Sequence, residues 1–150
     1  MKIAIGCDHA GTALKKEILP VLAELSIEWK DFGTDSEESV DYPDFGEKVS
    51  GAVSKGEAER GILICGTGIG MSIVANKFPG VRASLCNEVY SAKMSRLHND
   101  ANLLVLPGRI IDKKTAKDVV RTWFSTPFEG GSHQRRLDKI KAIEERLKCQ

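Results

Sequence analysis

Gly61-Ile62-Leu63-Ile64-Cys65-Gly66-Thr67-Gly68-Ile69-Gly70 joins a short apolar run to a glycine-rich loop, and this stretch decides the fold. The run from Gly61 to Cys65 is typical of a strand that is buried on both faces. Residues 71–76, directly after the loop, predict a short helix. A buried strand that passes through glycines into a helix is the repeating unit of a parallel, doubly wound sheet.

The same alternation of apolar runs and amphipathic stretches extends along the whole chain. The expected strands are 3–7, 28–32, 61–65, 81–86 and 102–106. The expected helices are 12–25, 43–55, 71–76, 88–98, 115–124 and 135–147. Pro20 falls inside the first helix and is expected to bend or divide it. The pattern predicts an α/β fold, a three-layer α/β/α Rossmann-like sandwich around a five-stranded parallel sheet.

Composition limits the classes of protein to which the chain can belong. Its 150 residues fit a single domain, and 22 Lys and Arg against 21 Asp and Glu give a formal net charge of +1. This balance provides no field that would attract nucleic acid or an anionic membrane. We expect neither a signal peptide nor a membrane span. The four cysteines are widely separated, which favours reduced thiols and a cytoplasmic location.

Polar residues follow three of the expected strands at the points where these strands end. Asp8 and His9 follow the first strand, Cys65 and the glycine loop close the third, and Arg109 follows the fifth. Parallel sheets of this class bind ligands outside the carboxyl ends of their strands. We therefore expect these residues to form a ligand site at one edge of the sheet.

The glycine loop 66–70 differs in spacing from three known phosphate loops. The dinucleotide fingerprint requires Gly-x-Gly-x-x-Gly, and a Walker loop requires Gly-Lys-Ser/Thr. A cysteine phosphatase loop would require arginine where Met71 stands. Two interpretations remain. The loop is either an anion cradle of backbone N–H groups that favours a Cys65 thiolate, or a tight turn that packs a helix against a strand.

Other candidate residues also have a purely structural interpretation. Cys7 and Cys86 end expected strands as Cys65 does, and such cysteines are usually small buried hydrophobes. Asp8 could cap the first helix, and the helix dipole favours a histidine at the position of His98. The three histidines are too far apart in sequence to predict a metal site. The residues alone thus indicate an α/β domain that binds a small anion beside a thiol, and they name no reaction.

Six segments of the chain resemble the type B ribose-5-phosphate isomerase family, which also includes the galactose-6-phosphate isomerase subunits. In chain order they are 6–11 (GCDHAG), 41–43 (DYP), 64–70 (ICGTGIG), 75–77 (ANK), 95–102 (SRLHNDAN) and 128–133 (FEGGSH). The resemblance implies an aldose–ketose isomerase without cofactor or metal. Such an enzyme interconverts D-ribose 5-phosphate and D-ribulose 5-phosphate through a cis-enediolate, in the pentose phosphate pathway.

The resemblance also implies roles for individual residues. Cys65 is the base that moves a proton between C2 and C1, Thr67 relays a proton between substrate oxygens, and His98 opens the sugar ring. The enediolate oxygens bind to the loop residues Gly66, Thr67, Gly68, Ile69 and Gly70. The substrate hydroxyls map to Asp8, Tyr42 and Asn99. The phosphate maps to His9, Arg109, Arg136 and the position of Ser132.

In the family, His98 and the C-terminal arginines reach the site from the opposite subunit. The resemblance therefore implies a homodimer, or a tetramer of two dimers, in which the C-terminal helix of about 133–148 packs on a partner. One residue departs from the family pattern, because Ser132 replaces the usual arginine; His133, Arg135 or Lys139 could compensate. Two alternatives stay open: a 6-phosphohexose such as allose or galactose 6-phosphate as substrate, and a non-catalytic phosphate- or nucleotide-binding module.

Overall fold

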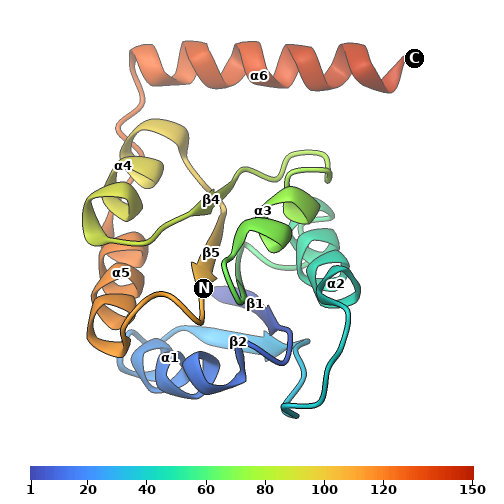
Figure 1. Ribbon diagram of the computed structural model, residues 1–150. Helices are drawn as coiled ribbons and strands as arrows, with labels where there is room; N and C mark the ends of the chain where they lie inside the picture. Colours follow the sequence, from blue (N-terminus) through green and yellow to red (C-terminus); the bar gives the residue numbers. More distant parts are fainter.

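Strands and helices alternate in the order that the sequence predicts, as a computed structural model of residues 1–150 shows (Figure 1). The strands are β1 (Lys2–Cys7), β2 (Glu28–Asp31), β3 (Arg60–Cys65), β4 (Ala83–Leu85) and β5 (Leu103–Pro107). The helices are α1 (Thr12–Glu24), α2 (Tyr42–Ser54), α3 (Ile69–Ala75), α4 (Val89–Asn99), α5 (Lys113–Ser125) and α6 (Ser132–Lys148).

All the strands lie in one parallel sheet with the order β2-β1-β3-β5-β4. At its centre, Ile62 of β3 lies between Ile5 of β1 and Leu104 of β5. On one side of β1 lies β2, and on the other side lie β3, β5 and β4 in this order. The expected α/β fold with a five-stranded parallel sheet is therefore confirmed. The direction of winding reverses between β1 and β3, and sheets of this class bind ligands at the carboxyl ends of the strands at such a point.

Alternate residues of the central strands enter two different cores. One core lies between the sheet and helices α1, α4 and α5, and it contains Ile3, Ile5 and Trp123. The other lies between the sheet and helices α2 and α3, and it contains Leu63 and Met71. All of these side chains are fully buried, and full burial of a large aliphatic side chain contributes roughly 1.5–3 kcal/mol. The two cores give the expected three layers.

Pro20 does not divide α1, so this part of the expectation is wrong. The helix runs without interruption from Thr12 to Glu24 with Pro20 inside it. Proline removes one N–H donor, which leaves the Lys16 carbonyl without its helical partner. Both Pro20 and Lys16 are exposed. Water can therefore satisfy this carbonyl, and the buried face of the helix remains intact.

The strand β4 is shorter than the sequence predicts, with residues 83–85 in place of 81–86. Arg82 causes this difference at the amino end. Its backbone N–H donates to the Asn102 side-chain oxygen at 2.8 Å and not to a neighbouring strand. The apolar character of the segment thus predicted a strand without fixing its boundaries.

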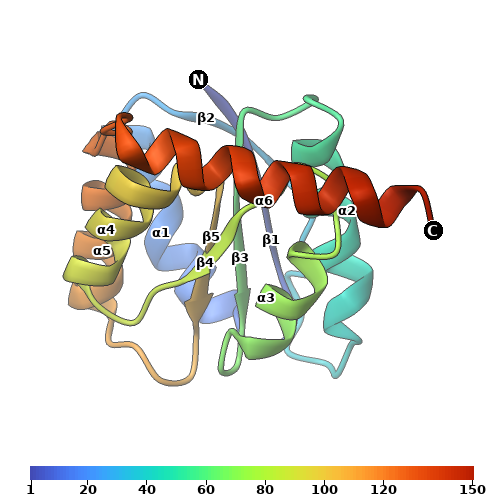
Figure 2. The ribbon, with the colours of Figure 1, turned by 90° about the horizontal axis from the view of Figure 1, so that it is seen from above.

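Helix α6 lies apart from the three layers, beyond the edge strand β4 and on the side of the sheet away from β2 (Figure 1). Figure 2 shows that it extends from the side of α4 and α5 to the side of α2 and α3. The helix contains no buried residue. Its Glu144 carboxylate accepts a hydrogen bond from the Gly80 N–H at 2.9 Å. Neither α6 nor any other helix combines the length and the apolar character needed to cross a membrane.

Candidate active site

The segments that follow β1, β3 and β5 are joined by backbone hydrogen bonds at the carboxyl edge of the sheet. The Asp8 N–H donates to the Ile64 carbonyl at 3.2 Å. The Gly108 N–H donates to the Cys65 carbonyl at 2.8 Å, and the Arg109 N–H donates to the Gly66 carbonyl at 3.0 Å. The structure therefore brings together the residues that the sequence places after these three strands.

The loop after β3 has the backbone geometry of an anion cradle. Because the Cys65 and Gly66 carbonyls point toward the segment after β5, the planar peptide directs the following N–H groups, of Gly66 and Thr67, to the opposite side. Gly68 has a positive φ of 78°, and a Cβ atom there would collide with Leu85 Cδ1. The Thr67 hydroxyl accepts a hydrogen bond from the Ile69 N–H at 3.2 Å. These contacts fix the loop beside the Cys65 side chain, which is 4% exposed.

Two side chains lie against the glycines of this loop. A Cβ atom at Gly66 would lie 3.5 Å from Arg109 Cδ and 3.7 Å from Arg109 Nη1. A Cβ atom at Gly70 would lie 2.6 Å from the ring of Tyr42. The Arg109 side chain thus lies beside the backbone on which an anion would bind, and the absence of a Cβ atom at Gly70 allows the Tyr42 phenol to approach it closely. This combination can hold a negatively charged ligand with an additional hydroxyl contact.

Asp8 and His9 are held by local hydrogen bonds. Asp8 is 6% exposed, and its carboxylate accepts a hydrogen bond from the Ala10 N–H at 3.0 Å. It does not cap α1, whose N-cap is Gly11 without a side-chain cap, so that structural interpretation is wrong. His9 Nδ1 accepts a hydrogen bond from the Val40 N–H at 3.2 Å. The proton of the neutral imidazole therefore lies on Nε2, which can donate to a ligand.

The structure distinguishes Cys65 from the other cysteines that end expected strands. Cys7 and Cys86 are fully buried in the core of α1, α4 and α5, whereas Cys65 lies on the side of α2 and α3. Burial raises the pKa of Cys7 to about 11 and also raises the pKa of Cys86. Their thiols donate to the Thr34 carbonyl at 3.4 Å and to the Ser84 carbonyl at 3.7 Å. Both are structural thiols, which leaves Cys65 as the candidate base.

Sequence reasoning missed Lys15, which is buried in α1 and positions the turn after β2. Its ammonium group lies 2.9 Å from Asp31 and 2.8 Å from Asp35, and it donates to the Thr34 carbonyl at 2.9 Å. Burial alone would lower the pKa of Lys15, but the hydrogen bonds that its ammonium group donates to both carboxylates outweigh this effect and raise the pKa. In the sequence, the only signal for this role is that a lysine stands among the apolar positions of an amphipathic helix. The turn leads to Val40, which orients His9.

His98 and Asn99 lie at the opposite edge of the sheet. They form the last turn of α4, and the Asn102 carbonyl just beyond accepts the N–H of Gly61, near the start of β3. The four residue steps from Gly61 to Cys65 correspond to roughly 13 Å of strand. Within one chain, His98 is therefore not a neighbour of Cys65.

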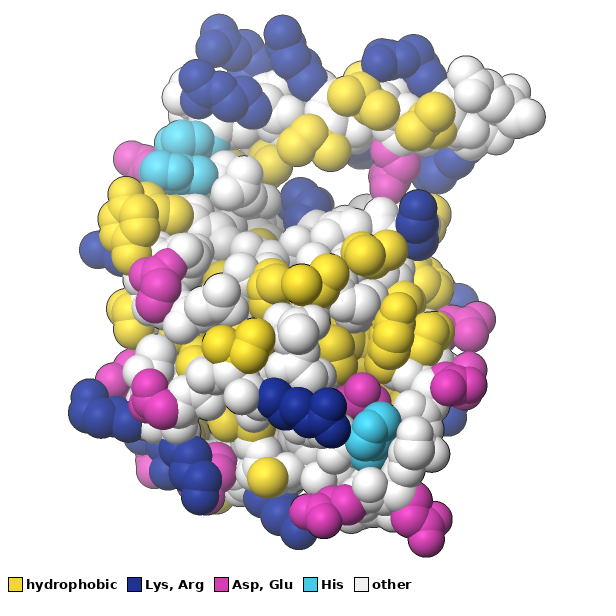
Figure 3. All heavy atoms as spheres, in the orientation of Figure 1, with side chains coloured by type: hydrophobic (Ala, Val, Ile, Leu, Met, Phe, Trp, Pro, Cys, Tyr) yellow, Lys and Arg dark blue, Asp and Glu magenta, His cyan; other side chains and the backbone are white.

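Two further predicted residues, Ser132 and Arg136, also lie at this second edge, in the first turns of α6. Arg136 Nη1 donates to Ser132 Oγ at 3.5 Å. The His133 ring stacks on the His98 ring with a centroid separation of 4.2 Å. Figure 3 shows this pair of histidines below α6 and the third histidine of the chain well separated from it.

The predicted site residues thus form two groups in space. We call the first the carboxyl-edge group; it consists of Asp8, His9, Tyr42, Cys65, the loop 66–70 and Arg109. We call the second the amino-edge group; it consists of His98, Asn99, Ser132 and Arg136. The arginines of α6 do not join His9 and Arg109 within one chain. The first group combines a thiol that could serve as a base with backbone N–H groups that could stabilise an oxyanion, and a proton abstraction next to a carbonyl requires both.

Comparisons with known proteins show the family to which the chain belongs. A family model described as Ribose/Galactose Isomerase matches residues 3–140. Ribose-5-phosphate isomerase B of Escherichia coli strain K12 is 51% identical over 145 residues, which are 97% of each chain. D-erythrulose-4-phosphate isomerase of Pectobacterium atrosepticum is 39% identical over 151 residues and covers 100% of this chain and 99% of its own.

A solved structure gives the same result for the fold. The structure of ribose-5-phosphate isomerase B from Clostridium thermocellum superimposes with a TM-score of 0.95 at 54% sequence identity. The match covers 98% of this chain and 99% of that chain. The likeness thus includes both edges of the sheet as well as α6. With the family match over most of its length, the chain belongs to the ribose/galactose isomerase family.

Proposed function

We propose that the protein is an aldose–ketose isomerase that interconverts D-ribose 5-phosphate and D-ribulose 5-phosphate. One observation carries this proposal: Cys65 ends the central strand β3 directly before a glycine loop that is built to hold an oxyanion. The high identity to a relative named ribose-5-phosphate isomerase B supports the choice of substrate.

The isomerisation begins with ring opening, because the furanose form has no free carbonyl. His98 acts there as acid and base, since imidazole exchanges protons near neutral pH. The Cys65 thiolate then takes the proton from C2 of the open aldose, and the C1 oxygen becomes the enediolate oxyanion. The N–H groups of the loop 66–70 stabilise this charge. Thr67 moves the hydroxyl proton from O2 to O1, and the Cys65 thiol returns its proton to C1.

The phosphate and the hydroxyls of the open chain bind around this centre. His9 Nε2–H and the Arg109 guanidinium bind the phosphate, because both offer charge-assisted donors. Asp8 accepts from a substrate hydroxyl, and Tyr42 contacts another hydroxyl. No step of this proposal uses a metal or a cofactor.

A second copy of the chain completes the site. Cys65 and His98 lie at opposite edges of one sheet, yet the reaction needs both at one substrate. In a homodimer, the amino-edge group of one chain faces the carboxyl-edge group of the other. Asn99 then contacts a substrate hydroxyl, and Arg136 binds the phosphate. Two such sites form per dimer, and two dimers can pair into a tetramer.

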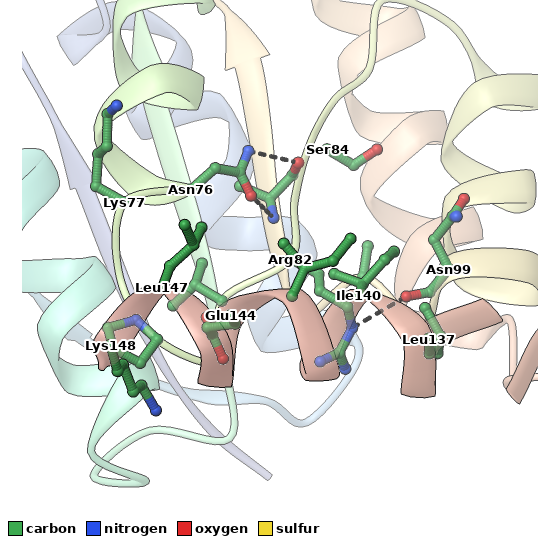
Figure 4. A pocket seen from close by; sticks show the side chains of 15 residues that line it. Asn76, Lys77, Arg82, Ser84, Asn99, Leu137, Ile140, Glu144, Leu147 and Lys148 are labelled. Carbon is green, nitrogen blue, oxygen red and sulfur yellow. Dashed lines mark hydrogen bonds between the residues drawn. The ribbon is translucent and has the colours of Figure 1, made fainter. Parts of the chain in front are cut away.

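The apolar face of α6 supports the dimer. Ile140, Ile143 and Leu147 are 51%, 47% and 61% exposed. With Leu137 they line an open groove of about 780 Å³ between α6 and the amino ends of β4 and β5 (Figure 4). Figure 3 shows the apolar side chains of α6 turned toward this hollow. Exposed apolar surface of this extent favours a protein partner. We assign that partner to a second copy of the chain, packed along α6.

The thiol state and the charge of the chain support the proposed location and ligand. Its four cysteines are free thiols, in agreement with a cytoplasmic enzyme. The formal net charge of +1 argues against nucleic acid or an anionic membrane as partner. A small phosphorylated sugar needs only the local charges of His9 and Arg109.

Ser132 favours a second candidate substrate. Ser132 stands where the family resemblance implies an arginine that binds the phosphate. Without this arginine, the length of the substrate is the property that the site residues constrain least. The relative named D-erythrulose-4-phosphate isomerase has a name that specifies a different sugar phosphate. A 6-phosphohexose, allose or galactose 6-phosphate, is therefore the alternative. Comparison of kcat/KM over pentose 5-phosphates, hexose 6-phosphates and erythrulose 4-phosphate decides between them.

The proposal is tested with ribose 5-phosphate in the presence of EDTA, with the parent protein beside Cys65→Ala. We expect turnover by the parent that EDTA does not abolish, and a loss of roughly 100-fold or more in Cys65→Ala, because a positioned general base contributes about 10²–10⁴. Cys149→Ser serves as the matched control, because Cys149 is an exposed thiol at the end of α6. Equal turnover by the parent and Cys65→Ala would contradict the role of Cys65.

A non-catalytic binding module on the same fold predicts a different result. It would bind sugar phosphates without converting any sugar of the panel. Alkylation provides an independent measurement: we expect iodoacetamide to modify Cys65 and a bound sugar phosphate to protect it. An inert Cys65 together with absent turnover would favour the module.

A further inference from the structure

Three side chains that can bind a metal ion meet where α6 begins. His98 comes from the end of α4, Glu129 from the segment before α6, and His133 from the first turn of α6. Glu129 Oε2 lies 3.8 Å from His98 Nε2 and 3.4 Å from His133 Nε2. The donor atoms all lie within 4.8 Å of one another. Two imidazoles and one carboxylate form a known ligand set for zinc with a remaining open position.

The backbone holds these three residues together. The Glu129 N–H donates to the Leu97 carbonyl at 3.0 Å, which attaches the segment to the residue before His98. Gly130 and Gly131 follow with positive φ angles of 73° and 59°, so the chain turns sharply. This turn returns His133 to the face of His98. The ligand positions therefore do not depend on the conformation of a long loop.

The side chains retain the freedom that metal binding requires. Zinc bonds of about 2.0–2.1 Å place tetrahedral donors roughly 3.4 Å apart, so the widest pair of donors must approach by about 1.4 Å. The two imidazoles are now stacked with an interplanar angle of 14°, and this stack must open. The His98 and Glu129 side chains are 41% and 58% exposed, which permits the rotation.

We propose that His98, Glu129 and His133 bind a divalent transition-metal ion such as Zn²⁺, and that this ion reversibly inhibits the isomerase. The ion occupies His98 Nε2 and thereby removes the acid–base group that opens the sugar ring. The inhibition rests on the proposed function, whereas the binding of the ion does not. Removal of the ion restores the imidazole, so the bound ion regulates the enzyme and takes no part in the reaction.

Binding is tested by titration of the full-length, EDTA-treated protein with Zn²⁺ against a chromophoric chelator. We expect one ion per chain at this site. Glu129→Gln and His133→Asn should each lower the affinity by roughly 10-fold or more, because each removes a ligand or its charge. Cys149→Ser, the matched control for thiol binding, should leave the affinity unchanged. The Co²⁺ form should show no sulfur-to-cobalt charge-transfer band.

The proposal is overturned if the protein binds no Zn²⁺, or if Glu129→Gln and His133→Asn bind it as tightly as the parent. A sulfur band or a loss of affinity in Cys149→Ser would also overturn it. For inhibition, we expect Zn²⁺ to slow the parent and EDTA to restore it, with Glu129→Gln about 10-fold less sensitive relative to its own activity. Zn²⁺ binding without inhibition of an active isomerase would overturn the regulatory role. Zn²⁺ binding by a protein without isomerase activity would instead refute the proposed function and leave the metal site standing.

Discussion

The phenol ring of Tyr42 lies so close to Gly70 that a Cβ atom at position 70 would be 2.6 Å from both Cε2 and Cζ of the ring. Gly70→Ala must therefore displace the ring from the loop. Tyr42 is 39% exposed, so its ring can move at little cost in stability. We expect KM for the sugar phosphate to rise roughly 10-fold through the loss of a hydroxyl contact, with a nearly unchanged melting temperature.

Gly51→Ala is the matched control for this prediction. Gly51 also lies in a helix, but a Cβ atom there would meet its nearest neighbour, Phe78, at 3.8 Å, which is ordinary contact. Steady-state kinetics should give the parent KM for Gly51→Ala. An unchanged KM in Gly70→Ala would show that the Tyr42 ring does not position the substrate.

Gly68 and Gly80 provide a second matched pair. Both have positive φ angles, 78° and 76°, so alanine causes similar backbone strain of about 1–2 kcal/mol at each. At Gly68 the added Cβ would also collide with Leu85, whereas at Gly80 it would meet nothing within 4 Å. Urea denaturation should therefore show a larger loss of unfolding free energy for Gly68→Ala than for Gly80→Ala, by roughly 1–3 kcal/mol. Equal losses would mean that the loop after β3 is not tightly packed.

The buried Cys7 thiol predicts how stability depends on pH. Burial raises its pKa from 9.0 to about 11, so the folded protein keeps the proton in a range where the unfolded chain has lost it. The stabilisation is complete below pH 9 and is lost as the pH rises toward 11, up to about 3 kcal/mol. Denaturation at several pH values should show a smaller loss over this range in Cys7→Ala. Parallel curves for the two proteins would contradict the raised pKa.

The fold could be predicted from the sequence because buried strands consist of runs of apolar residues, and such runs are visible in the sequence. The run Gly61–Cys65 is apolar on both faces and therefore predicted a buried strand, and the structure confirms it. Pro20 shows the limit of the rule that proline bends or divides a helix. This rule considers only the local sequence and does not say which side of the helix faces water. The same limit applies to β4, whose end depends on the distant Asn102 side chain.

The candidate site could be predicted only in part. The strand ends predict the meeting of Asp8, Cys65 and Arg109, because parallel strands share one carboxyl edge. The spacing of residues in the sequence could not place His98, because the direction of α4 carries this residue to the amino-terminal edge of the sheet. Nor could spacing bring His98 and His133 together, because their contact depends on the glycine turn before α6. The roles of these residues came from the family resemblance.

Ser132→Arg tests whether the phosphate lacks one donor. The new guanidinium would lie one helical turn from Arg136, on the same face of α6, where Ser132 Oγ now accepts from Arg136. We expect KM for ribose 5-phosphate to fall roughly 10-fold, because a hydrogen bond to a charged group contributes about 1.5–3 kcal/mol. Gln134→Arg, which points to another side of the helix, is the control and should keep the parent KM. An unchanged or higher KM in Ser132→Arg would mean that Ser132 does not face the phosphate.

The central claim is that Cys65 of one chain and His98 of another serve the same substrate. Cys65→Ala and His98→Asn, each inactive alone, should regain activity when they are unfolded together and refolded as mixed dimers. Statistical mixing puts half of the dimers in mixed form with one intact site of two, so the recovered activity should approach about a quarter of the parent value. A control mixture of Cys65→Ala with the double variant Cys65→Ala/His98→Asn should regain none. If the first mixture also stays as inactive as its components, the two residues do not act across a subunit boundary.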